Sequence, residues 1–200
     1  MSVDTLLALA GYALVTSITP GPNNLMLLAS GVNFGLRRTL PHLAGISTGF
    51  FVLVFSVALG FAQLFTTFPA LYTLVRLVGA AYLLWLAWQI ATAPSPTSEN
   101  SQRRPMTFLG AAAFQWVNPK AWVMAVSASA NYLPASIDLL QVCLIATVYA
   151  LVNAPSVAIW ALFGAQLRDW LGQPRTRRAF NIVMAILLVT TLYPMLTASL

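Results

Sequence analysis

The stretch TSITPGPNNLMLL (residues 16–28) interrupts a long apolar segment with two prolines, a glycine and two asparagines. Proline lacks a backbone N–H, so one helix is expected to end at Pro20 and another to begin at Pro22. At membrane depth, such irregular backbone is tolerated only where protein buries it or where it lines a cavity. The interruption therefore predicts either a simple kink or a ligand site inside the membrane.

The composition indicates that lipid is the solvent of most of this surface. Hydrophobic residues make up 59% of the 200 residues and charged residues only 7%, and the mean hydropathy is +0.80. Soluble domains carry about 25% charged residues. Because a spanning helix needs about 20 apolar residues, the chain has room for about six.

The sequence thus predicts an all-α polytopic membrane protein with a single transmembrane domain (1–200). A polar linker rich in Pro and Ser (93–105) separates repeat one (1–92) from repeat two (106–200), with three spans in each. The six predicted spans cover residues 5–32, 40–63, 70–92, 107–131, 138–163 and 178–198.

Several function classes are excluded at this stage. The N-terminus carries Asp4 instead of a basic region, so it does not read as a cleaved signal peptide. Cys143 is the only cysteine, which argues against a disulfide, a redox CxxC pair or a thiolate metal site. The net charge of +6 falls mainly in loops, so it indicates topology and no nucleic-acid partner.

The basic residues that lie in predicted loops occur only in alternate loops. The second and fourth loops, near Thr66 and Pro134, contain no Lys or Arg. Since short cytoplasmic loops collect Lys and Arg, loops one, three and five are predicted to face the cytoplasm and both termini to face outside. The basic residues of these three loops are Arg37, Arg38, Arg103, Arg104, Arg168, Arg175, Arg177 and Arg178.

A second interruption, FQWVNPKAWVMAV (residues 114–126), lies in the fourth span. Aligning Pro22 with Pro119 places each break near the middle of the first helix of its half. With three spans per half, the two halves are predicted to be inverted-topology repeats, an arrangement that many secondary transporters use around a central site.

Each break is expected to start a half-helix whose N-terminus faces the membrane midplane. Gly21 and Asn118 are the predicted N-caps. Free N–H groups and the helix dipole favour a carboxylate at such ends. Kinks that bind nothing are the alternative, but corresponding breaks in both halves favour a site. The predicted substrate-binding residues are Gly21, Pro22, Asn23, Asn24, Gln115, Asn118, Pro119 and Lys120.

Lys120 is the only lysine and lies in the middle of the fourth span. A charge there costs about 2.5–3.5 kcal/mol on insertion scales. We expect Lys120 either to pair with a substrate carboxylate or to lose its proton when the site is empty, which makes it the candidate for proton coupling. Arg76 and His42 are expected to lie near the interfaces, and the Gly45/Gly49 pair is expected to allow close helix packing.

The acidic residues restrict the substrate. All four lie in predicted loops or at span ends, so no carboxylate is expected at the midplane to receive a cationic side chain. The α-amine of a substrate is expected to meet carbonyl groups around Ser17 and Gln115. This favours small neutral zwitterions over lysine or arginine.

The sequence resembles the amino-acid exporter family named for the lysine exporter and the homoserine/threonine resistance proteins (LysE/RhtB). The similarity covers nearly the whole chain and includes TPGPNN (19–24), GVNFGLRRTLPHLAGISTGF (31–50), LVGAAYLLWLAWQIA (77–91) and FQWVNPKAW (114–122). It is greatest for the branch that exports cysteine and O-acetylserine. Basic-amino-acid exporters of this family typically carry intramembrane acidic residues, which this chain lacks.

The resemblance implies a bacterial inner-membrane secondary transporter that exports amino acids or related metabolites and is coupled to protons. Its partners would be a small neutral amino acid, protons and the lipid bilayer; a homodimer is left open. No catalytic residue, metal site or cofactor is predicted. A passive pore, an exporter of other metabolites and a non-transporting interaction subunit remain alternatives, whereas a thiol–disulfide carrier would need paired cysteines.

Overall fold

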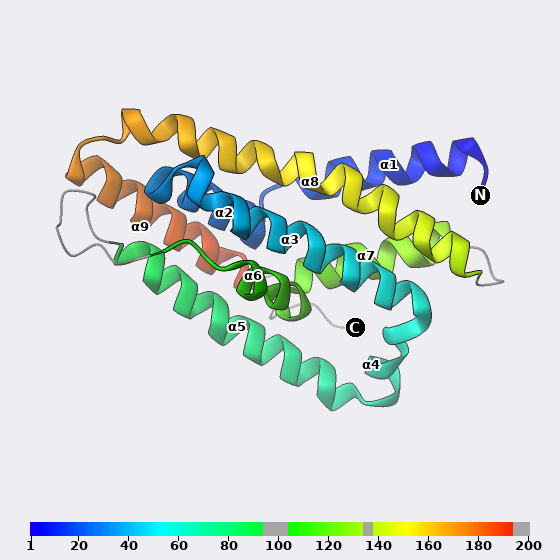
Figure 1. Ribbon diagram of the computed structural model, residues 1–200. Coiled ribbons are helices and arrows are strands. Elements are labelled where there is room, and N and C mark those ends of the chain that lie inside the picture. Colours follow the sequence, from blue (N-terminus) through cyan, green and yellow to red (C-terminus); the bar gives the residue numbers. More distant parts are fainter. Residues whose placement is uncertain (94–103, 134–137, 194–200) are drawn as a thin grey trace.

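The computed structural model describes residues 1–93, 104–133 and 138–193, and within these ranges all regular structure is helical. Most of the predicted linker (93–105) and the fourth loop near Pro134 lie outside the described residues. The elements are α1 (Val3–Ile18), α2 (Pro22–Phe34), α3 (Leu36–Ser56), the π-helical turn η1 (Val57–Phe61), α4 (Gln63–Thr67), α5 (Pro69–Ala91), α6 (Phe108–Phe114), the 3₁₀ turn η2 (Gln115–Val117), α7 (Pro119–Tyr132), α8 (Leu139–Trp170) and α9 (Pro174–Thr190) (Figure 1).

The predicted membrane class is confirmed at the level of an all-helical, multi-pass protein. Among the described residues, three helices are long and apolar enough to cross a bilayer: Leu36–Phe61, α5 and α8. The pair α1 and α2 passes the same test when counted as one span, and it is bent by 55° at its break. The complete six-span repeat arrangement stays a prediction.

Helix α8 packs along α1, α2 and α3 (Figure 1). Helix α5 packs on α9, and α6 packs on α3. The Gly45/Gly49 prediction is confirmed: a Cβ at Gly45 would collide with the Phe108 carbonyl, and one at Gly49 would lie 2.5 Å from the Ala112 Cα. Small residues therefore let α6 approach α3 closely.

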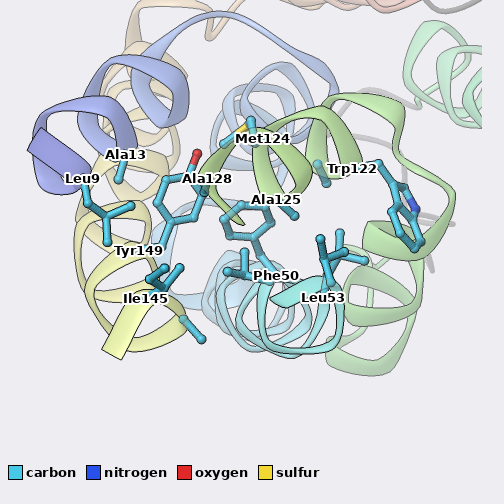
Figure 2. Packing of buried hydrophobic residues seen from close by; sticks show 14 of the residues in the cluster. Leu9, Ala13, Phe50, Leu53, Trp122, Met124, Ala125, Ala128, Ile145 and Tyr149 are labelled. Carbon is cyan, nitrogen blue, oxygen red and sulfur yellow. The ribbon is translucent and has the colours of Figure 1, made fainter. Parts of the chain in front are cut away.

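One buried cluster joins α1, α3, α7 and α8. The rings of Phe50 and Tyr149 have centroids 5.1 Å apart, and Ala125 and Ala128 of α7 lie against them with no exposed surface (Figure 2). The hydroxyl group of Tyr149 is 2.7 Å from the hydroxyl group of Thr16. The cluster thereby extends from the apolar core to the break in the first span.

Large apolar side chains cover the outside of the helices. Examples are Leu14 and Val15 on α1, Leu74 and Leu77 on α5, and Leu151 on α8, all of which are exposed. Such a surface would be unfavourable in water and suits contact with lipid chains.

The basic connections lie together at one end of the bundle. The α2–α3 connection, the C-terminal end of α5 and the α8–α9 connection are at this end, and the N-terminus and α4 are at the other (Figure 1). Gly35 makes the α2–α3 connection with φ 77°, a conformation that L side chains rarely adopt. The sequence pattern predicted that the basic loops face one side of the membrane, and their position at one end of the bundle agrees with it.

The proposed orientation can be tested by cysteine labelling in a Cys143→Ala background. Gln173, in the α8–α9 connection, and Thr66, in α4, are both exposed. In intact cells, Thr66→Cys is expected to react with an impermeant maleimide and Gln173→Cys to be protected, because only the former would face outside. Permeabilised cells provide the control, since both sites should then react; the reverse pattern in intact cells would overturn the topology.

Candidate functional site

The break between α1 and α2 removes two helical hydrogen bonds, because each proline of the PGP motif lacks an N–H. The carbonyl groups of Thr16 and Ile18 lose their partners in this way. The Thr16 carbonyl accepts a hydrogen bond from the Thr19 hydroxyl at 2.9 Å. The Ile18 carbonyl accepts one from the Trp160 indole N–H of α8 at 3.1 Å. The irregular backbone is therefore satisfied by side chains within the protein.

Asn24, in the first turn of α2, caps the end of α1. Its side-chain amide donates to the Ser17 and Thr19 carbonyls, each at 2.8 Å, and only 3% of the residue is exposed. The Ser17 carbonyl, expected from the sequence to receive a substrate amine, thus already accepts a hydrogen bond from Asn24.

Lys120 reaches from α7 to the end of α1 in the other half of the chain. Its ammonium group donates to the Thr19 carbonyl at 2.8 Å, the Thr19 hydroxyl at 2.9 Å and the Pro20 carbonyl at 3.2 Å. These acceptors match its three N–H donors and lie at the negative end of the α1 dipole. Lys120 therefore has protein partners without a substrate, which the sequence analysis did not anticipate.

Gly21 leaves the space that Lys120 occupies. A Cβ at Gly21 would lie 2.7 Å from Lys120 Cδ and 3.0 Å from its Nζ. The backbone at Gly21 is extended (φ −178°, ψ 177°), which any residue can adopt. Glycine is thus needed here for the close approach of the lysine and not for its backbone conformation.

The second break follows the predicted pattern at its N-cap position. Asn118 precedes α7, which begins at Pro119, as Gly21 precedes α2. The Asn118 side chain, however, makes no capping hydrogen bond. Its Oδ1 is buried without a partner among the described residues. A buried acceptor without a partner is unfavourable and so indicates a place for a water or a ligand.

A reciprocal pair of amides connects the two breaks. Asn23 Nδ2 donates to Gln115 Oε1 at 2.8 Å, and Gln115 Nε2 donates to Asn23 Oδ1 at 3.1 Å. Gln115 also donates to the Ala111 carbonyl at 2.9 Å and has no exposed surface. The two half-helix ends are therefore held together by partly buried polar contacts between repeat one and repeat two.

A cavity of about 20 Å³ lies between the breaks. We call it the central cavity. It has room for about one water molecule, so a substrate can enter only if the lining residues move apart. Its lining consists of Thr16, Ser17, Gly21, Asn23, Asn24, Phe50, Asn118, Lys120, Ala121, Met124, Asn153 and Val157.

The structure brings most of the predicted site residues together. Five of the eight line the central cavity, and Gln115 contacts it through its pair with Asn23. Pro22 and Pro119 do not line it; Pro119 lines an apolar cavity of about 200 Å³ beside α5. The prolines therefore shape the breaks without facing the central cavity.

Asn153 of α8 is a site residue that the sequence analysis missed. Its Nδ2 donates to the Ser17 hydroxyl at 2.9 Å, and its Oδ1 is buried without a partner in the described part of the chain. Its position inside an apolar span, two residues before Pro155, was the available signal, because polar residues at membrane depth are commonly functional.

Among the residues that the structure describes, Lys120 is the only charged one that lines the central cavity. No group of three or more His, Cys, Asp or Glu residues suited to a metal ion occurs within residues 1–93, 104–133 and 138–193. The cavity thus combines one cation, amide groups and two helix N-termini.

Comparison with known families helps to decide whether this chain is a kinked bundle that binds nothing or a transport protein. Residues 14–191 match the family described as LysE type translocator. The chain belongs to this family. This LysE-type translocator is accordingly a membrane transporter and not an enzyme, as the sequence analysis predicted.

The relatives of this LysE-type translocator include efflux proteins. The cysteine/O-acetylserine efflux proteins of Escherichia coli K12 and Shigella sonnei are each 37% identical to it over 191 residues, covering 94% of this chain and 96% of each relative. No solved structure matches the chain.

Proposed function

We propose that this protein exports small neutral amino acids, or close derivatives, from the bacterial cytoplasm across the inner membrane in exchange for protons. The names of its relatives support amino-acid efflux, since they are cysteine/O-acetylserine efflux proteins. The proposal depends mainly on the central cavity. Within the described part of the chain, its lining brings together one cation and two amide oxygens without partners, and it contains no carboxylate.

A substrate carboxylate suits the side of the cavity occupied by Lys120. The ammonium group can exchange its carbonyl acceptors for a carboxylate, which forms the stronger charge-assisted hydrogen bonds. In the first turn of α2, Asn23 and Asn24 also have N–H groups without an intrahelical acceptor. Together with the helix dipole, these donors favour an anionic group at this position.

The substrate's α-ammonium group suits the two amide oxygens. Asn118 Oδ1 and Asn153 Oδ1 are acceptors that lack a donor in the described part of the chain, and both residues line the cavity. A zwitterion supplies the missing donors and the carboxylate at once. A cationic side chain would find no carboxylate among the lining residues, so lysine and arginine are disfavoured.

Transport requires that binding changes the contact between the two halves. In this structure, Lys120 of repeat two holds the end of α1 in repeat one. When a substrate carboxylate binds the ammonium group, Lys120 releases the end of α1. The substrate therefore favours a different arrangement of the two halves. We assign the proton to the same lysine, because it is the ionisable group at the site.

This cycle fits six spans in two inverted repeats, with both termini outside and access alternating around the central cavity. The matching Gly-Pro and Asn-Pro starts of α2 and α7 support the repeat, and the clustering of basic connections at one end supports the orientation.

Substrate class can be tested by resistance in a sensitive bacterial host. Expression is expected to raise the inhibitory concentration of azaserine, a neutral ester of serine, several-fold and to leave that of canavanine, an arginine analogue, unchanged. Efflux of radiolabelled O-acetyl-L-serine from loaded cells is the direct measurement. Protection against canavanine alone would contradict the argument from the missing carboxylate, and efflux that never proceeds against a gradient would indicate a passive pore.

A further inference from the structure

A second cavity, larger than the central one, lies further along α2. It holds about 150 Å³, which is the size of an engineered protein cavity that admits benzene, so a small amino acid can fit. We call it the inner cavity. Its polar lining residues are Ser30, Asn33, His42, Gln89 and Arg104, and its apolar ones include Met26 and Leu86.

The inner cavity is close to the end of the bundle where the basic connections gather. Phe34, the last residue of α2, and Ala93, which follows α5, line it, and both helices end there (Figure 1). Asn23 of the central cavity and Met26, Ser30 and Asn33 of the inner cavity are spaced by three or four residues. They therefore lie on one face of α2, and this face borders both cavities.

His42 shows that the inner cavity is built for a polar occupant. The residue is 2% exposed, and neither ring nitrogen has a partner among the described residues. A neutral imidazole offers one donor and one acceptor, and burying both without partners is unfavourable. A ligand with both kinds of group would satisfy them. His42 was expected near a membrane interface, and the burial of its side chain was not predicted from the sequence.

Ser30 adds an acceptor to the same lining. The Thr39 hydroxyl donates to the Gly35 carbonyl at 2.9 Å, so its contact of 2.9 Å with the Ser30 hydroxyl must use the Ser30 hydrogen. The Ser30 oxygen therefore keeps lone pairs for a donor such as an ammonium group. Arg104, exposed at the rim, supplies a positive charge for a carboxylate.

We propose that the inner cavity is a second, cytoplasm-facing binding site for the exported zwitterion, in which His42, Ser30 and Arg104 hold the substrate before it reaches Lys120. The proposal rests on the function proposed above. In this scheme the substrate is captured at the inner cavity, and proton exchange takes place later at the central cavity. Substitutions in the inner cavity should therefore change the apparent affinity and not the turnover rate.

The test is uptake of radiolabelled O-acetyl-L-serine by inside-out membrane vesicles, which present the cytoplasmic face to the label. His42→Leu is expected to raise KM about tenfold with little change in maximal rate, because each lost hydrogen bond to a charged group weakens binding by about that factor. His42→Gln, which keeps a donor and an acceptor, is expected to retain a KM near the parental value. Melting of the purified proteins is the stability readout, and His42→Leu should not melt earlier, since it removes a buried polar group without partners.

Arg104→Gln is the second variant, and because Arg104 is exposed it leaves the fold intact. It is expected to raise KM several-fold at low salt, whereas Arg175→Gln, an exposed arginine outside the cavity, should not. A parental KM in both His42→Leu and Arg104→Gln would overturn the inner site and leave the proposed function standing. If the parental protein moves neither O-acetyl-L-serine nor any other small neutral amino acid, the proposed function fails and the inner site fails with it.

Discussion

Lys120→Gln is expected to lose most export and most substrate binding at parental expression. The substitution removes the positive charge of the central cavity and its three hydrogen bonds to Thr19 and Pro20. The substrate carboxylate would lose its hydrogen bond to the ammonium group. Hydrogen bonds to a charged group contribute about 1.5–3 kcal/mol, so the affinity for a zwitterion should fall about 10- to 150-fold. Efflux of radiolabelled O-acetyl-L-serine and binding to the purified protein are the two measurements.

Lys120→Arg separates charge from proton exchange. A guanidinium group keeps the positive charge but stays protonated, so this variant is expected to bind substrate and to lose efflux driven by a proton gradient. Arg37→Gln is the matched control, because it removes an exposed positive charge far from the cavity lining and should export normally. Parental export by Lys120→Gln would show that the lysine is structural and that the coupling proposal is wrong.

The breaks could be predicted because their cause is local. Proline removes a donor wherever it stands, and its fixed φ suits the first turn of a helix. The starts of α2 at Pro22 and α7 at Pro119 therefore agree with the sequence analysis residue for residue. Lys120 and both asparagines of the PGPNN motif were found by the same local argument, which pairs a break with polar residues inside an apolar span.

The remaining site residues depend on contacts between distant parts of the chain. Asn153 joins the cavity because α8 packs along α1, and sequence spacing does not contain that contact. Gln115 was predicted on the strength of its carbonyl, yet its side chain forms the pair with Asn23. His42 was expected near an interface because it lies close to the end of a span, but the sequence did not show that packing around α3 buries its side chain.

The partners of Lys120 illustrate the same limit. From the sequence, Lys120 was expected to pair with a substrate carboxylate or to lose its proton, and all acidic residues lie in loops or at span ends. The acceptors are instead carbonyl groups that the PGP break exposes in the other half of the chain. The break between α1 and α2 thus leaves carbonyl groups free, and these carbonyl groups stabilise the ammonium group of Lys120 from the other half. Only the folded arrangement shows this contact.

Gly21→Ala is expected to reduce export about tenfold or more while the protein folds and expresses normally. The added methyl group would lie 2.7 Å from Lys120 Cδ, so the lysine must move. Moving the flexible end of one side chain costs little stability. However, a shift of about 1 Å takes the ammonium group out of hydrogen-bond range of the Thr19 carbonyl, now at 2.8 Å. Gly11→Ala is the matched control in the same span, because nothing lies within 4 Å of a Cβ there.

A double substitution decides whether Gly21 acts through Lys120. If the methyl group only displaces the lysine, Gly21→Ala should add no further loss of efflux in a Lys120→Gln background, since residues that act as a unit are not additive. Equal fractional losses in the parental and Lys120→Gln backgrounds would instead place the effect in the α1–α2 break itself. The backbone at Gly21 is extended and open to alanine, so we expect the non-additive result, with the glycine and the lysine of opposite halves behaving as one contact.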